Sequence, residues 1–250
     1  MDLGLTDRVI IVTGATSGLG LASARVLLDE GARVLLSSRS PERVSEAVAT
    51  LETEYGDRVR GMAADNADTA TAARLVDEAT GTWGRIDGLL VSVGGPPGGG
   101  LKTVTDEQWR SAFDSVFLGT MRLIQAATER MPAGSAIGLV LSSSVRQPIG
   151  GLIISNGLRP GLAMAAKTIA DELGPQGIRV VSLVPGRIAT PRTLDVDDAS
   201  DATARNKTIA LGRLGEPAEF GRVAAFVLSP AASYLTGCIV TVDGGMIRAL

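Results

Sequence analysis

Histidine is absent from this chain, and cysteine occurs once, at Cys238. Without histidine there is no Ser-His-Asp relay, no imidazole general base and none of the commonest zinc ligand. A single cysteine forms neither an internal disulfide nor a cysteine metal cluster, so no metal site is expected. No segment resembles a secretory signal, and we expect a reducing cytoplasm as the compartment.

An excess of positive charge is also missing, because 24 lysines and arginines face 27 aspartates and glutamates, a formal net charge of −3. Such a chain carries no general cationic field for phosphate backbones or anionic lipids. No apolar run approaches the roughly 20 residues that span a bilayer. Neither nucleic acid nor a membrane is therefore expected as a partner.

Apolar runs of strand length alternate with longer amphipathic segments along all 250 residues. This alternation is typical of stacked βαβ units, and strands that are apolar on both faces indicate a sheet covered by helices on both sides. The sequence predicts an α/β fold with a Rossmann-like, doubly wound parallel sheet. No linker divides the chain, so residues 1–250 are expected to form one domain. The predicted strands are 8–13, 33–37, 58–63, 87–92, 136–141, 178–184 and 238–242, and the predicted helices are 18–30, 41–55, 70–82, 106–131, 162–173 and 217–228.

Two stretches break this pattern, a glycine-proline run at 94–100 and a polar insertion at 190–210. Both follow predicted strands, and open α/β sheets bind their ligands at the carboxyl ends of strands. We expect 190–210 to be a mobile substrate loop, although each stretch could also be a plain surface loop.

A glycine-rich segment, Thr13 to Gly20, joins the first predicted strand to the first predicted helix. Glycines allow a tight turn close to a diphosphate, and the helix offers unpaired N–H groups and the positive end of its dipole. The segment therefore predicts a dinucleotide site. Its expected cofactor contacts are Gly14, Thr16, Ser17, Gly18, Leu19 and Gly20.

Ser38 and Arg39 directly follow the second predicted strand, where an NAD-binding protein commonly carries an acidic residue for the ribose. Arg39 can pair with a ribose 2′-phosphate, which favours NADP(H) over NAD(H); a solvated arginine is the alternative. Asp65, with Asn66 beside it, follows the third strand and is placed to meet the adenine, or is a loop aspartate.

Taken together, the chain resembles the short-chain dehydrogenase/reductase family over essentially its full length. Thr13 to Gly20 matches the family's Thr-Gly-x-x-x-Gly-x-Gly, and 185–190 matches its Pro-Gly-x-Ile-x-Thr. The resemblance implies that Asp65 serves the adenine side and that Pro185, Gly186, Ile188 and Thr190 close over the nicotinamide. It also implies a homo-oligomer, a tetramer or a dimer.

The family's catalytic Tyr-x-x-x-Lys is replaced here by Ser155 and Arg159, and Val116 stands where its assisting asparagine belongs. The family's Asn-Asn-Ala-Gly element reads 91–94, Val-Ser-Val-Gly, in this chain. Arg159 keeps a cation for the ribose hydroxyls, and the resemblance adds Val91 and Gly94 to the expected cofactor contacts.

The resemblance also implies a catalytic serine, and Ser142 lies thirteen residues before Ser155, which is the family's spacing. Ser143 or Ser144 could take that role, or these hydroxyls could merely cap the strand end. A serine hydroxyl is a much weaker acid than a tuned tyrosine, so Ser155 can hold a substrate oxygen but is a poor proton donor.

The leading hypothesis is an NADP(H)-dependent oxidoreductase that moves hydride between nicotinamide and a carbonyl or alcohol, with Ser142, Ser155 and Arg159 as catalytic residues. A small-molecule substrate is therefore expected. Two alternatives remain open: a catalytically weak nucleotide-binding or sensing protein, and a non-redox dehydratase or isomerase that uses the same pocket.

Overall fold

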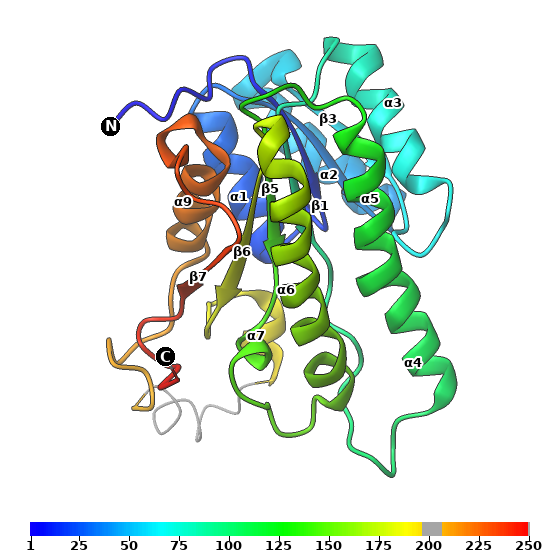
Figure 1. Ribbon diagram of the computed structural model, residues 1–250, viewed down its shortest axis with the longest axis vertical. Coiled ribbons are helices and arrows are strands. Elements are labelled where there is room, and N and C mark those ends of the chain that lie inside the picture. The colour runs from blue at the N-terminus through cyan, green and yellow to red at the C-terminus, as the bar shows by residue number, and fades with distance from the viewer. Residues whose placement is uncertain (197–206, 250) are drawn as a thin grey trace.

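A parallel sheet of seven strands forms the centre of the chain (Figure 1), whose computed structural model describes residues 1–196 and 207–249. The strand order is β3-β2-β1-β4-β5-β6-β7, with every neighbouring pair parallel. The predicted doubly wound, Rossmann-like α/β fold is confirmed. The strands are β1 Val9–Thr13, β2 Arg33–Ser38, β3 Val59–Ala63, β4 Gly88–Ser92, β5 Ala136–Val140, β6 Arg179–Pro185 and β7 Cys238–Val242.

Helices cover both faces of the sheet and produce two apolar cores. On one face α1, α2 and α9 pack around Phe220 and the leucines of α1. On the other face α3, α5 and α6 pack against the opposite side chains of the same strands. Every residue of β1 and β5 is buried, as expected for strands enclosed by helices. The helices are α1 Gly18–Asp29, α2 Pro41–Tyr55, α3 Thr71–Trp83, α4 Asp106–Ala112, α5 Gly119–Thr128, α6 Ile153–Leu173, α7 Pro191–Val196 and α9 Pro217–Leu228.

Two helices differ from the sequence prediction. The continuous helix expected over 106–131 is divided into α4, a π-helical segment η2 (Phe113–Leu118) and α5. The helix expected from Leu162 begins at Ile153 instead and carries Pro160 within it. Tertiary packing explains the second difference, because Ile154 and Leu158 are buried against Ala112 in a small core of their own.

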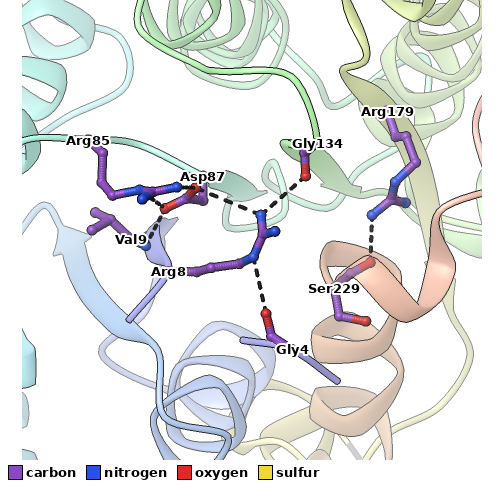
Figure 2. Close-up of polar contacts among 8 residues, drawn as sticks. All are labelled: Gly4, Arg8, Val9, Arg85, Asp87, Gly134, Arg179 and Ser229. Carbon is purple, nitrogen blue, oxygen red and sulfur yellow. Dashed lines mark hydrogen bonds and ion pairs between the residues drawn. The ribbon is translucent and has the colours of Figure 1, made fainter. Parts of the chain in front are cut away.

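A polar cluster closes the end of the sheet where the strands begin (Figure 2). The fully buried carboxylate of Asp87 accepts hydrogen bonds from Arg85 at 2.5 and 2.8 Å and from the Val9 amide at 2.9 Å. Arg8 lies 3.7 Å from the same carboxylate and donates to the carbonyl of Gly134. These contacts join the starts of β1, β4 and β5, and they leave the opposite end of the sheet to the loops.

The strand order reverses direction between β1 and β4, which lie side by side although β2 and β3 separate them in sequence. Loops at the carboxyl ends of two such strands diverge and leave a crevice between them. Of the expected substrate loop at 190–210, residues 197–206 lie outside the described residues, and its first part forms α7. Among the described helices, none combines the length and the hydropathy needed to cross a membrane.

Candidate active site

The loops after β1 and β4 touch at the crevice. The Thr13 hydroxyl donates to the carbonyl of Ser92 and accepts from its amide, each at 3.1 Å. Gly14 has φ +58°, and a Cβ on it would lie 2.2 Å from the Ser92 carbonyl oxygen. Only glycine fits both the backbone conformation and this close approach.

The first turn of α1 presents backbone N–H groups to the crevice. The cap residue Ser17 makes no side-chain hydrogen bond to this turn, whereas Ser40 caps α2 and Thr105 caps α4. An uncapped helix start carries partial positive charge and free donors, which suit a phosphate group. Gly94, across the crevice, faces open space, because no atom lies within 4 Å of where its Cβ would be.

The first of two large cavities, about 540 Å³, extends from the glycine loop toward β2 and β3. It is lined by the predicted cofactor residues Ser38, Arg39, Asp65 and Asn66. The Asp65 carboxylate accepts a hydrogen bond from the Ala67 amide at 3.0 Å and so also shapes its own loop. This cavity has the position and chemistry to hold the adenosine half of a dinucleotide.

The second cavity, about 800 Å³, extends from the glycine loop toward β5 and β6. It shares part of its lining with the first, including Gly14, Ser17 and the segment 92–96, so the two are continuous. Ser142, Ser155 and Arg159 all line it. So do the remaining predicted cofactor residues, which are Gly18, Leu19, Gly20, Gly94, Pro185, Gly186, Ile188 and Thr190, while Thr16 lines the first cavity alone.

Val91 is the one predicted cofactor residue that lines neither large cavity. It is buried in β4 with 3% of its surface exposed and borders only a space of about 10 Å³ that also touches Arg159. Val116 borders this small space as well, from η2. Two apolar side chains therefore lie where the family resemblance implies polar groups.

The serines after β5 make other contacts than their spacing in the sequence predicts. The Ser142 Oγ accepts a hydrogen bond from the Ser144 amide at 3.2 Å and begins the short 3₁₀ helix Ser143–Val145. Ser144, not Ser142, contacts the hydroxyl of Ser155, with 3.2 Å between the two Oγ atoms. Ser144 and Ser155 are both about 95% buried. The structure thus brings Ser155 into a hydrogen-bonded pair with the serine that spacing ranked behind Ser142.

Arg159 lies one turn after Ser155 on α6 and is buried. Its guanidinium donates to the carbonyls of Val140 at 2.5 Å and Val93 at 3.2 Å, at the ends of β5 and β4. Burial, followed by repulsion from Arg192, lowers the pKa of Arg159 to about 10. The side chain therefore stays cationic at neutral pH and holds a positive charge at the floor of the second cavity.

Neither tyrosine can replace the one that is missing from the motif. Tyr55 lies at the end of α2 and donates to Asp29, and Tyr234 is fully exposed beyond α9. Neither side chain lines a described cavity.

Sequence reasoning missed several residues that line the cavities. Arg43 lines the first, and Arg187 and Arg192 line the second. Their positions in the sequence could have indicated them, because Arg43 lies in the first turn of α2, four residues beyond Arg39. Arg187 lies within the Pro-Gly-x-Ile-x-Thr segment, and Arg192 lies two residues after it. The amide of Asn156 was also missed; it pairs with both backbone groups of Ile149, at 2.9 and 3.0 Å, and so holds the 147–150 wall of the second cavity.

Known proteins match nearly the whole chain. A family model described as enoyl-(acyl carrier protein) reductase matches residues 14–247. Dehydrogenase/reductase SDR family member 4 of Homo sapiens is 35% identical over 246 residues, covering 96% of this chain and 88% of that protein. L-rhamnose 1-dehydrogenase (NAD(P)(+)) of Azotobacter vinelandii is 31% identical over 251 residues, covering 97% of both chains.

A solved structure of known activity has the same fold. The L-sorbose reductase of Gluconobacter frateurii, complexed with NADPH and L-sorbose, superposes with a TM-score of 0.93 at 29% identity and full coverage of both chains. The similarity of this chain to these proteins, in sequence and in fold, thus covers both the sheet and the crevice. The chain belongs to the short-chain dehydrogenase/reductase family.

Proposed function

We propose that this protein transfers hydride between NADP(H) and a carbonyl or alcohol group of a small molecule. As a member of its family it is an NAD(P)-dependent oxidoreductase. The observation that carries the proposal is the continuous pair of cavities along the ends of β1 and β4, with the uncapped start of α1 between them. L-sorbose reductase, which shares this architecture, was solved with NADPH.

The choice of NADP(H) rests on charge at the end of β2. Arg39 and Arg43 line the first cavity there, and no acidic residue ends the strand. Within the described part of the chain the Arg39 guanidinium makes no hydrogen bond or ion pair. A ribose 2′-phosphate would give both arginines an anionic partner, whereas the hydroxyl of NAD(H) would not.

In the second cavity the chain's own residues bind, orient and stabilise charge. When bound, the cofactor supplies or accepts the hydride. Arg159 is placed to hold the ribose hydroxyls, and Ser142 and Ser155 to hold the substrate oxygen, with Ser144 fixing the Ser155 hydroxyl. None of these groups is a tuned acid near neutral pH, so the proton must come from water or from a substrate hydroxyl.

The cofactor proposal is tested by titrating NADPH and NADH into wild type, Arg39→Ala and Arg130→Ala, followed by fluorescence. Arg130 is an exposed arginine just beyond α5 that lines no described cavity, which makes it a matched control. Loss of one charge-assisted bond to phosphate should weaken NADPH binding about tenfold or more and leave NADH binding unchanged. Equal affinity of the wild type for the two nucleotides would remove the basis for the Arg39 assignment.

A weak or inactive nucleotide sensor is the second candidate, favoured by the absence of a competent acid beside Ser155. The two are separated by mixing the protein with NADPH and a panel of ketones and aldehydes. Tight NADPH binding without oxidation of NADPH by any of them would favour the sensor, and steady oxidation would exclude it.

The proposal includes three further properties. We place the protein in the cytoplasm because its single cysteine is suited to a reducing compartment. We take the chain as one domain built on its single sheet, with the described part of 190–210 as a wall of the substrate cavity. We also propose a homo-oligomer, a tetramer or a dimer, which light scattering can test.

A further inference from the structure

The second cavity is lined by three arginines. Arg159, Arg187 and Arg192 contribute to its wall, from α6, from the loop after β6 and from α7. No aspartate or glutamate is among the described residues that line it. The first cavity differs, because Asp65 and Glu107 accompany its two arginines.

The proposed cofactor does not account for this charge. Its 2′-phosphate would lie at Arg39 and Arg43 in the first cavity, and its diphosphate would lie at the glycine loop, where α1 offers uncapped N–H groups. The nicotinamide end carries no negative charge of its own. A bound ligand should complement the charges that it meets, so a cation of this cavity that makes no ion pair calls for an anion in the substrate.

Arg192 is the cation best placed to meet that anion. Its guanidinium lies directly against Gly95, close enough that a Cβ there would fall on the guanidinium itself, so the side chain reaches from α7 across the cavity to the loop after β4. Among the described residues it makes no hydrogen bond or ion pair. Its charge repels that of Arg159.

A guanidinium held in this way keeps its planar set of donors available for two parallel hydrogen bonds to one oxyanion. An anion would also relieve the repulsion between Arg192 and Arg159. The reacting end of a substrate held by Arg192 would extend toward the hydroxyls of Ser155 and Ser142, which line the same cavity. Positioning by a remote charged group is an efficient use of binding energy.

We propose that the substrate carries an oxyanionic group, a carboxylate or a phosphate, and that Arg192 binds this group, with Arg187 as a second cation on the wall of the same cavity. The inference rests on the proposed function, since it concerns the substrate of the same reaction. It assigns a specificity-determining role to α7, a part of the chain that the sequence treated only as a polar loop.

The test measures binding to the NADPH-saturated protein by isothermal titration calorimetry, with benzoate, phenyl phosphate and neutral benzamide as probes. The variants are wild type, Arg192→Gln, Arg187→Gln and the control Arg130→Gln, which removes the same charge outside the cavity. The wild type and the control should prefer an anionic probe over benzamide by about tenfold or more, and Arg192→Gln should abolish most of that preference. The stronger anionic probe identifies a carboxylate or a phosphate as the preferred group.

Three results would overturn the inference while the proposed function stands, because NADPH binding is measured first. They are equal affinity of the wild type for the anionic and neutral probes, an anion preference that survives in Arg192→Gln and Arg187→Gln, and no binding of any probe up to about 10 mM. If Arg192→Gln weakens NADPH binding but leaves the probes unaffected, Arg192 serves the cofactor diphosphate instead. Failure of the wild type to bind NADPH would overturn both proposals.

Discussion

Ser155 and Arg159 are one turn apart on α6, and both point into the second cavity. The structure thus keeps the helix on which the resemblance places the family's tyrosine and lysine, with Pro160 tolerated inside it. The two replacements change the acid–base chemistry that these positions can perform. A serine hydroxyl does not titrate near neutral pH, and a buried arginine offers charge and donors but no transferable proton.

Restoring the family pair should therefore raise turnover. We expect Ser155→Tyr with Arg159→Lys to increase the rate of NADPH oxidation with a generic ketone by roughly 10²-fold, the usual contribution of a positioned general acid. The measurement compares wild type, both single variants and the double variant across pH. The double variant should gain a pH dependence that the wild type lacks.

The single variant Ser144→Ala serves as the companion experiment, because it removes the hydroxyl that lies 3.2 Å from Ser155 without touching the motif. If the wild type already turns over as fast as the double variant, the serine site has its own proton source. A large loss of rate in Ser144→Ala would then locate that source in the Ser144–Ser155 pair.

At the scale of elements, α1 and α2, on one face of the sheet, are joined by a partly buried hydrogen bond. The Tyr55 hydroxyl, at the end of α2, donates to the Asp29 carboxylate at the end of α1, at 2.5 Å. Burial first, and the bond to Asp29 second, raise the pKa of Tyr55 above its ordinary value of 10.0. The folded state therefore holds the phenolic proton more tightly than the unfolded state.

The sign of the pH effect follows from that shift. The stabilisation is fully present below pH 10 and is lost as the pH rises above it toward the higher pKa of the folded state. Tyr55→Phe should lower the free energy of unfolding by about 1 kcal/mol at pH 8, and the difference from wild type should shrink between about pH 10 and pH 11.

Urea denaturation at several pH values measures this, with Tyr234→Phe as the matched control. That substitution removes the same hydroxyl from a fully exposed ring and should leave the free energy of unfolding unchanged. A constant difference between Tyr55→Phe and wild type across the whole pH range would contradict the linkage to tyrosine ionisation.

At the scale of the whole molecule, the small residues of α5 and α6 do not all face outward. Ala127, Ala163 and Ala166 are small enough to allow close contact between subunits, but they are buried in the chain's own core. Exposed apolar side chains lie elsewhere, at Met164 on α6 and at Phe113 in η2, whose ring stacks on that of Phe117 with 5.3 Å between the ring centroids. We expect these side chains to take part in a contact between subunits.

We expect light scattering at micromolar concentration to give a multiple of the 25.7 kDa chain mass. Met164→Glu should shift the protein toward the monomer, because it would place like charges across a two-fold contact. Thr168→Glu, one turn further along and also exposed, tests how far that contact extends. A wild type of monomeric mass would reject the homo-oligomer.

The fold could be predicted from the sequence because the signals that specify it are local. Strands such as Val9–Thr13 are apolar on both faces, amphipathic helices follow them, and glycines punctuate the turns, so each element can be recognised without its neighbours. The glycine loop and the Pro-Gly-x-Ile-x-Thr segment were readable for the same reason, and all but Val91 of the predicted cofactor residues line the two cavities.

What only the tertiary structure decided concerns residues brought together from distant parts of the chain. Spacing ranked Ser142 first, but the turn of the 3₁₀ helix directs Ser144 at Ser155. A periodic pattern predicted one long helix where packing inserts the π-helical segment η2. The arginines of the second cavity come from α6, the loop after β6 and α7, and their shared potential exists only once those elements converge. Sequence patterns fix local backbone preference and burial, whereas distances between side chains are set by packing, which no local pattern encodes.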